Sequence, residues 1–401
     1  MSPIPWIVPV FPEEEGSRRH AAIRNAMDRE GLECLIVAGV CGNYGDRAGN
    51  FRYVSNYAPW FDDEYIVFPR VGDPMLLAWS ITHAEWCKKI SWIKQVETVG
   101  VMSTDPSRKM ANAARIAEFV NSLRCGQGRI GICDFQTMPV YVYLGLKKLL
   151  PGAVFVDAGE LLSHLRMIKS PMELDFMKKA GDCADIGFKA MLETARPGVS
   201  ETKVWAACEY AMTVAGATPP SFTLMSGGPS LREKGRGQPY AGTGRTLQKG
   251  DIITNEISAS YGGYWVQLCA PIVIGDSIPD DLRQMFQVHQ EMYELALEQM
   301  RPGITLGSIH EKHRELARSR GCDPSPAWAL AHIGLLIRDD IAPETVLQPN
   351  MTFVNHPYTQ YTQAGSGTYS HHTIGNTAVI TERGCEVLNR TPMEVFLSGS
   401  Y

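Results

Sequence analysis

Three side chains that can bind or react lie in one short stretch, residues 250–275 (GDIITNEISASYGGYWVQLCAPIVIG). Two apolar runs separated by YGG predict a β-hairpin there. Glu256 falls in the first predicted strand. Gln267 and Cys269 are two residues apart in the second, so they share one face. Because buried polar groups are costly without partners, this face predicts either a satisfied hydrogen-bond network or a functional site.

The elements that precede the hairpin indicate an α/β domain over residues 1–160, because predicted helices alternate there with apolar strands. The predicted helices cover residues 17–32, 106–124 and 139–149, and the predicted strands cover 34–40, 64–69, 74–79, 129–134 and 153–158.

The rest of the chain indicates an internal duplication. Ser170, Pro171 and Glu173 form a capping-box pattern that starts a long helix. Two series then follow, each with a long helix, Arg-Pro-Gly, a second helix, a polar loop and strands. Their helices are 171–193 and 201–214, then 282–300 and 308–321; their strands lie in 250–275, then 351–358 and 374–380. The repeat predicts a duplicated α+β domain over 161–401, with a seam where sites commonly form.

Composition excludes several classes of function. The chain has 401 residues, 44% of them hydrophobic, which is enough for a large core and two or three domains. A formal charge of -5 argues against nucleic acid as a partner. The chain has no apolar run near the roughly 18 residues needed to span a bilayer. Its ten cysteines form no CxxC pair, so we expect free thiols in a reducing cytoplasm.

Several motifs follow the order of a known family: RMIKSPMEL, the two RPG turns, GDIIT, GGYW, TVLQPNMTFVNHP and NTAVITERG. The chain resembles the pita-bread family of methionine aminopeptidases, prolidases and creatinase, and the two-domain subgroup of prolidase and creatinase fits best. The resemblance implies an N-terminal creatinase-like α/β domain followed by a duplicated pita-bread catalytic domain.

The resemblance also implies a change at the metal site. Metal-dependent members hold two divalent ions with two Asp, one His and two Glu. The five matching positions here are Glu256, Gln267, Ala331 (or His332 after a one-residue shift), His356 and Gly375. This set has too few anionic oxygens for two hard cations, so we expect no metal cofactor. A rebuilt mononuclear site from Glu256, His332 and His356, with or without His371 or His372, stays open.

The match to creatinase itself is partial. The position of its catalytic histidine falls near Pro239, and its two substrate-gripping Glu positions fall on Cys269 and Gly375. In its N-terminal domain a Phe and an Arg reach across the dimer. Phe61 is retained here, whereas the Arg position is Asp63. We therefore expect a homodimer and a substrate with a cationic or amine-bearing end, although an acidic loop is equally well explained as a solvated turn.

The residues that the resemblance brings to the seam suggest an acid/base site. His356 is the expected general acid/base, Glu256 its partner or a cation-binding group, and His332 a further proton-transfer or substrate-binding group. Two other interpretations stay open. In the first, the site is decayed and His356 and Glu256 merely hydrogen-bond each other. In the second, Cys269 is a nucleophile rather than a core residue.

Other residues are expected to line the substrate pocket, although core packing explains the tyrosines equally well: Gln267, Cys269, Tyr264, Tyr240, His371, His372, Phe61 and Asp63.

The sequence thus predicts a cytoplasmic, metal-independent, creatinase-like hydrolase that cleaves a C–N bond in a small polar, nitrogen-containing metabolite. Three alternatives remain: a metal-independent lyase, an Xaa-Pro peptidase-like protein with a rebuilt mononuclear metal site, and a catalytically silent binding homologue.

Overall fold

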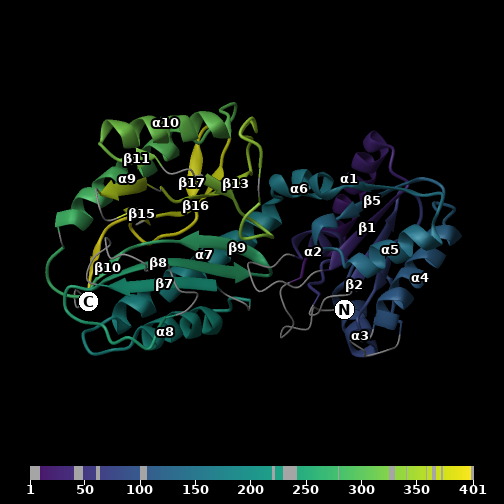
Figure 1. Ribbon diagram of the computed structural model, residues 1–401, viewed down its shortest axis with the longest axis horizontal. Coiled ribbons are helices and arrows are strands. Elements are labelled where there is room, and N and C mark those ends of the chain that lie inside the picture. The colour runs from purple at the N-terminus through teal and green to yellow at the C-terminus, as the bar shows by residue number, and fades with distance from the viewer. Residues whose placement is uncertain are drawn as a thin grey trace. The chain divides into compact units, whose positions relative to one another are not determined.

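The computed structural model divides the chain into two compact units, Met1–Met167 and Ile168–Tyr401. It describes residues 10–39, 48–59, 64–99, 106–218, 222–228, 242–278, 280–324, 330–339, 341–357, 359–363, 367–371 and 374–398. An N-terminal α/β unit followed by a larger α+β unit confirms the predicted architecture (Figure 1). The expected domain boundary at residue 160 falls inside helix α6 (Gly159–Met167), which closes the first unit.

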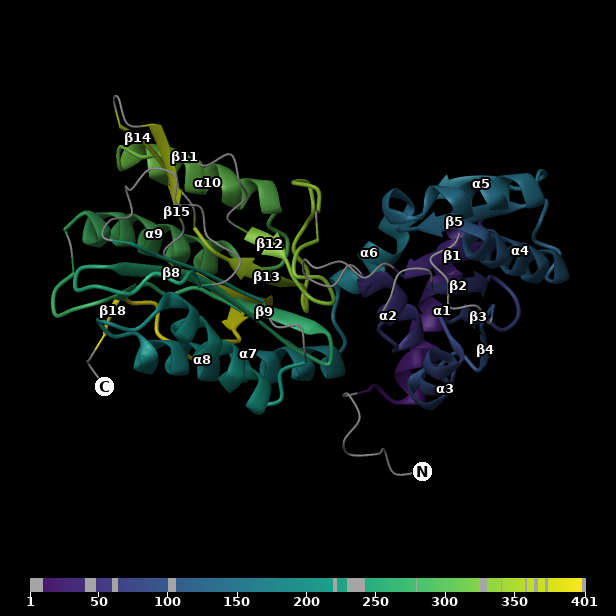
Figure 2. The ribbon, with the colours of Figure 1, turned by 60° about the horizontal axis from the view of Figure 1, so that its bottom comes forward.

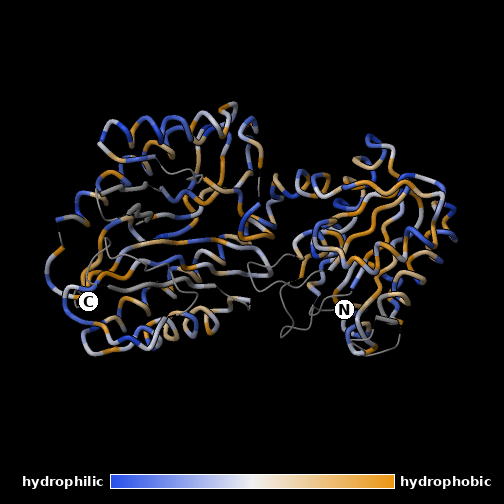
Figure 3. The backbone as a smooth tube through the Cα atoms, in the orientation of Figure 1, coloured by the Kyte–Doolittle hydropathy of each residue, from blue (hydrophilic) through white to orange (hydrophobic). Residues whose placement is uncertain are grey.

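The first unit is built on a mixed six-stranded sheet in the order β4-β3-β2-β1-β5-β6. All six residues of β1 (Cys34–Gly39) are buried, as expected for an apolar run in the middle of a covered sheet. These strands form an apolar band in Figure 3. The other strands are β2 (Glu64–Pro69), β3 (Met75–Leu77), β4 (Gln95–Glu97), β5 (Arg129–Cys133) and β6 (Val154–Asp157).

Helices cover this sheet and complete its core. Side chains of α4 (Pro106–Ser122) and α5 (Val140–Leu149) pack in one cluster with those of the strands. The remaining helices are α1 (Glu13–Glu30), α2 (Gly49–Ser55), α3 (Ile81–Ile90) and the 3-10 turn η1 (Phe135–Thr137). In the part of the chain that the structure describes, no helix has the length and apolar character needed to cross a membrane.

In the second unit, strands lie between two helix layers, α7 with α8 and α9 with α10 (Figures 1 and 2). The predicted capping box is confirmed: the Glu173 backbone N–H donates to Ser170 Oγ (3.3 Å), and the Ser170 N–H donates to Glu173 Oε2 (2.6 Å). The helices are α7 (Pro171–Thr194), α8 (Glu201–Val214), α9 (Asp280–Gln299) and α10 (Leu306–Ser319).

The predicted hairpin is also confirmed. Strands β8 (Ile252–Tyr261) and β9 (Tyr264–Leu268) pair antiparallel around Gly262-Gly263. Both glycines have positive φ, 57° and 83°, as a tight two-residue hairpin turn requires. β8 also pairs with β7 (Phe222–Gly228) and with β10 (Ile272–Val273), which pairs in turn with β18 (Phe396–Leu397).

The second repeat contributes two further sheets, ordered β12-β13-β16-β17 and β11-β14-β15. Their strands are β11 (Asp323–Pro324), β12 (Leu330–His332), β13 (Thr352–Asn355), β14 (Thr359–Gln363), β15 (Gly367–His371), β16 (Asn376–Ile380) and β17 (Cys385–Val387).

Backbone hydrogen bonds support the internal duplication. After each Arg-Pro-Gly turn the glycine N–H donates to a leucine carbonyl: Gly198 to Leu247 at 2.8 Å and Gly303 to Leu347 at 3.0 Å. The two glycines have nearly equal φ, 87° and 88°. Equivalent turns thus dock onto equivalent segments, each of which precedes a strand, in the two halves of the unit.

Candidate active site

The polar face of the hairpin is a hydrogen-bonded network at the seam. The register of β8 and β9 places Gln267 opposite Ser258. The Gln267 side-chain amide donates to Glu256 Oε2 and to Ser258 Oγ, both at 3.2 Å. Gln267 is only 5% exposed, and Glu256 is partly buried. The amide therefore holds the Glu256 carboxylate at a defined place on the sheet.

The second repeat forms hydrogen bonds with the backbone of Gln267 and Cys269, beside this network. The Gln267 N–H donates to Thr377 Oγ1 at 2.8 Å. The Cys269 N–H donates to the Gly375 carbonyl at 2.7 Å, and the Gly375 N–H returns a bond to the Cys269 carbonyl at 3.1 Å. These bonds join the sheets of the two repeats beside Gln267.

His356 packs on Gly375 at this junction. A Cβ added to Gly375 would lie 2.6 Å from the His356 Cβ and 2.8 Å from the Asn355 carbonyl oxygen. No larger side chain fits there unless the backbone moves. Glycine at position 375 therefore leaves room for the backbone and the Cβ of residue 356.

Glu256 and His356 occupy matching positions in the two repeats. Glu256 is nine residues after Leu247 and His356 is nine residues after Leu347, and these leucines make equivalent hydrogen bonds. One repeat thus presents a carboxylate where the other presents an imidazole.

Cys269 lies in this region but is poorly suited to attack a substrate. Its side chain is 0% exposed. Burial, with a further contribution from the nearby Glu256 carboxylate, raises the pKa of the Cys269 thiol well above its ordinary value. A neutral, buried thiol is a weak nucleophile, so the geometry favours the core reading of Cys269.

His332 is engaged on both sides of its ring. Its Nε2 lies 2.5 Å from Lys169 Nζ, and its Nδ1 lies 3.2 Å from Asp339 Oδ2. All three side chains are buried. Sequence reasoning missed Lys169 because it is 163 residues from His332 and its only local signal is that it precedes the capping box. With these contacts His332 does not present a ring nitrogen to a substrate, contrary to the role expected for it.

Tyr264 lies on the opposite face of β9 from Gln267, because side chains alternate along a strand. Its hydroxyl donates to Glu173 Oε1 at 2.7 Å, which fastens β9 to the start of α7. Tyr264 is thus a core residue with a satisfied hydroxyl, and the structure does not bring it to the Gln267 face as expected.

Several expected residues lie outside what the structure describes: Tyr240, Phe61, Asp63 and His372. His371 is the last residue of β15, and its backbone pairs with Thr359 of β14.

The side chains at the seam do not fit the two-metal centre that the family implies. Among the described residues, no group of three or more His, Cys, Asp or Glu side chains converges to hold a metal ion. Gly375 supplies no ligand atom, and an ammonium rather than open space faces Nε2 of His332. Two hard cations need several anionic oxygens, and Glu256 is the one carboxylate among the five matching positions.

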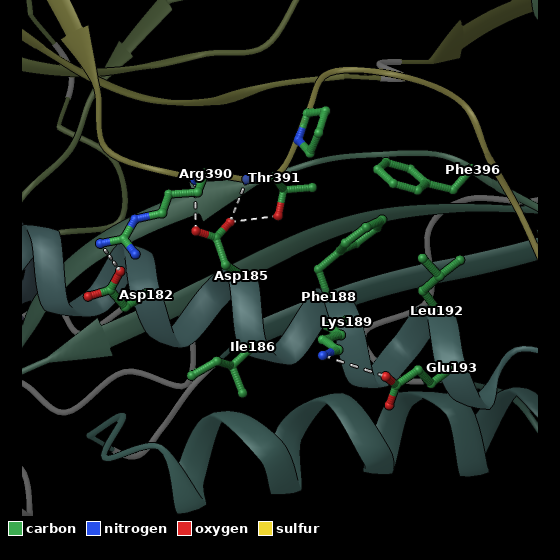
Figure 4. A pocket seen from close by; sticks show the side chains of 11 residues that line it. Asp182, Asp185, Ile186, Phe188, Lys189, Leu192, Glu193, Arg390, Thr391 and Phe396 are labelled. Carbon is green, nitrogen blue, oxygen red and sulfur yellow. Dashed lines mark hydrogen bonds and ion pairs between the residues drawn. The ribbon is translucent and has the colours of Figure 1, made fainter. Parts of the chain in front are cut away.

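A separate surface hollow of about 710 Å³ lies between α7 and the segment 390–396 (Figure 4). Its polar groups serve the fold: Asp185 accepts hydrogen bonds from the Arg390 and Thr391 backbone N–H groups, and Asp182 pairs with Arg390 at 3.2 Å. None of the residues expected in the active site lines it.

Comparison with known proteins supports the resemblance over nearly the whole chain. The sequence model of metallopeptidase family M24 matches residues 175–382, and that of the creatinase/prolidase N-terminal domain matches residues 19–168. The chain is 25% identical over 422 residues to the creatinase of Bacillus sp. (strain B-0618), covering 96% of this chain and 93% of that protein. It is 25% identical over 398 residues to the probable dipeptidase PepE of Mycobacterium tuberculosis (strain ATCC 25618 / H37Rv), covering 96% and 98%.

Solved structures share the fold. An Xaa-Pro dipeptidase from Bacillus anthracis superposes with a TM-score of 0.77 at 21% identity, covering 95% of this chain and 99% of that one. The prolidase from Pyrococcus horikoshii OT3 gives 0.76 at 22% identity, covering 94% and 99%. The chain belongs to metallopeptidase family M24, with a creatinase/prolidase N-terminal domain ahead of its M24 domain.

Proposed function

We propose that the protein is a hydrolase that cleaves a C–N bond in a small polar, nitrogen-containing molecule without a resident metal ion. One observation carries the proposal: the Cβ of His356 packs against Gly375, whose backbone is hydrogen-bonded to Cys269 beside the network of Glu256 and Gln267. In this proposal the site has lost metal-ligand positions of the family and gained an imidazole. The creatinase among its relatives supports a non-peptide C–N bond as the target.

In the proposed reaction His356 moves one proton. Imidazole changes charge near neutral pH, which suits it to act as both base and acid. Neutral His356 takes a proton from water as the water oxygen bonds to the substrate carbon. The imidazolium then gives that proton to the leaving nitrogen as the C–N bond breaks. No proton is gained or lost by the protein over the cycle.

Glu256 would bind the nitrogen-bearing end of the substrate. Its carboxylate already accepts a hydrogen bond from Gln267, which fixes its orientation. A held carboxylate favours an N–H-rich or cationic group, and it would also stabilise the imidazolium form of His356.

A metal-dependent Xaa-Pro peptidase is the second candidate, because several relatives bear that name, among them the Xaa-Pro dipeptidase of Pyrococcus furiosus at 27% identity over 248 residues. The donor set argues against it, since one carboxylate, one amide, two histidines and a glycine stand at the ligand positions.

We further propose a homodimer in the cytoplasm, with the segment around Phe61 and Asp63 contributing to the partner's site. The nine cysteines that the structure describes are free thiols, which supports a reducing compartment. Light scattering would test the dimer. A mixed dimer of His356→Ala and Asp63→Ala chains that regains activity would support the shared site.

The reaction is tested with chelator-treated protein in ¹⁸O-labelled water. The substrates are creatine, other guanidino, ureido and N-alkyl compounds, and Xaa-Pro dipeptides. Hydrolysis predicts two products whose masses sum to substrate plus one water, with ¹⁸O in one of them. His356→Ala should lower the rate about 100-fold or more, the usual contribution of a general acid/base. His164→Ala, an exposed histidine in the first unit, is the matched control.

Other outcomes point elsewhere. Products that sum to the substrate mass without ¹⁸O would indicate a lyase. Turnover of Xaa-Pro dipeptides that appears only after Mn²⁺ or Co²⁺ is added would indicate the peptidase. Full activity of His356→Ala would remove His356 from its role.

A further inference from the structure

A buried lysine lies at the seam of the second unit, and the backbone around it is shaped to admit it. The Lys169 N–H donates to the Asn350 carbonyl at 3.0 Å, which places the residue beside the start of β13. Lys169 is only 2% exposed. A Cβ on Gly334 would lie 2.8 Å from Lys169 Cε and 3.0 Å from its Nζ. Glycine at position 334 thus leaves room for the ammonium group.

The contacts of the ammonium define where the protons are. Lysine has three N–H donors and no acceptor, so the 2.5 Å contact makes Nε2 of His332 the acceptor. The ring proton of a neutral His332 must then be on Nδ1, where it donates to Asp339 Oδ2 at 3.2 Å.

We propose that Lys169 is a positioning residue. Its ammonium occupies the place at Nε2 of His332 that a divalent ion would need, and it thereby fixes His332 as the neutral Nδ1–H tautomer. A metal ion cannot share that nitrogen with an ammonium, because both need the same lone pair and carry the same sign of charge. At the histidine that a one-residue shift aligns with the family's ligand, a cation of the chain itself contacts the ring nitrogen.

The cluster is also fastened to the strand that carries Gln267. The Trp265 N–H on β9 donates to the Gly334 carbonyl at 2.8 Å. The turn at Gly334, which faces Lys169, is therefore hydrogen-bonded to β9 at a position two residues before Gln267. Lys169 holds this turn and His332 in place together.

The test is histidine-ring ¹⁵N NMR of the untagged full-length protein, with the His332 signals assigned by His332→Gln. At pH 7.5 the wild type should show a protonated Nδ1 and an unprotonated Nε2, and stoichiometric Zn²⁺ should leave both signals unchanged. Lys169→Met keeps the chain length and removes the charge. There Zn²⁺ should shift the Nε2 signal, with an affinity at least about tenfold higher than in the wild type.

Lys178→Met, an exposed lysine on α7, is the matched control and should behave as the wild type does. A wild-type His332 that is doubly protonated, or protonated at Nε2, would overturn the proposal, as would a wild-type signal that moves with one equivalent of Zn²⁺. The wild-type measurement decides the tautomer even where Lys169→Met does not fold. It needs no substrate, so failure of the proposed reaction would leave its outcome unaffected.

Discussion

Lowering the pH should loosen helix α10, because two histidines on it are buried in the neutral form. Burial lowers the pKa of His310 to about 3, with a smaller contribution from its neighbour His313, and burial lowers the pKa of His313 to about 4. His313 Nε2 lies 2.8 Å from the Met292 carbonyl oxygen on α9 and donates to it. Protonating His313 would place a charge between the two helices, and protonating His310 would place a second buried charge on α10.

The size of this effect follows from the linkage between protonation of His313 and local unfolding of α10, called opening below. In the open state His313 regains a pKa of about 6.5, so this state binds the extra proton as the pH falls below that value. The stability that the neutral ring supplies is complete above pH 6.5 and is lost progressively as the pH falls toward about 4. At pH 5 the loss amounts to about 2 kcal/mol, or about thirtyfold in the opening equilibrium.

Hydrogen exchange measured by mass spectrometry on peptides from Leu306–Ser319 reports this local opening. Protection is compared at pH 7.5 and pH 5 after correction for the intrinsic exchange rates. His313→Gln is the informative variant, because its amide N–H can still donate to the Met292 carbonyl but cannot titrate. The wild type should lose about thirtyfold more protection than His313→Gln over this interval.

Peptides from α4 in the first unit serve as the internal control and should respond equally in both proteins. Because His310 is present in both proteins, the part of its contribution that burial causes cancels in the comparison. Equal losses of protection around α10 in wild type and His313→Gln would refute the reasoning.

Two further substitutions test the fold around the site. Gly375→Ala should destabilise the protein by about 1–3 kcal/mol, because its new Cβ would overlap the Cβ of His356. Gly384→Ala is the control, because a Cβ at position 384 meets nothing within 4 Å. Equal melting temperatures for the two variants would contradict the packing. Ser170→Ala should lower the free energy of unfolding by about 1 kcal/mol, because it removes the capping box. Thr305→Ala should lower it less, because Thr305 makes no side-chain cap bond. The reverse order in urea unfolding would contradict the capping assignment.

Local rules were enough to predict much of the fold. The capping box at Ser170, the Gly262-Gly263 turn and the paired Arg-Pro-Gly turns each depend on residues within a few positions of one another. Their order along the chain then placed the duplicated unit after an α/β unit.

The candidate site was predicted less completely, because its contacts join residues far apart in sequence. The sequence around His332 gives no indication that Lys169, 163 residues away, would contact Nε2 of its ring. Tyr264 is different. The alternation along β9 already separates it from Gln267, although its partner Glu173 is 91 residues away. The network of Glu256 and Gln267 was foreseen as one of two alternatives, and the contacts show that it is hydrogen-bonded.

The loss of the metal centre is the central claim, and metal stoichiometry tests it most directly. The untagged protein is loaded with Mn²⁺, Co²⁺ or Zn²⁺, passed through a desalting column and measured by elemental analysis. The donor set at Glu256, Gln267, His356 and Gly375 predicts well below one equivalent of each metal. About one or two equivalents that survive desalting, and that Glu256→Gln abolishes, would contradict it.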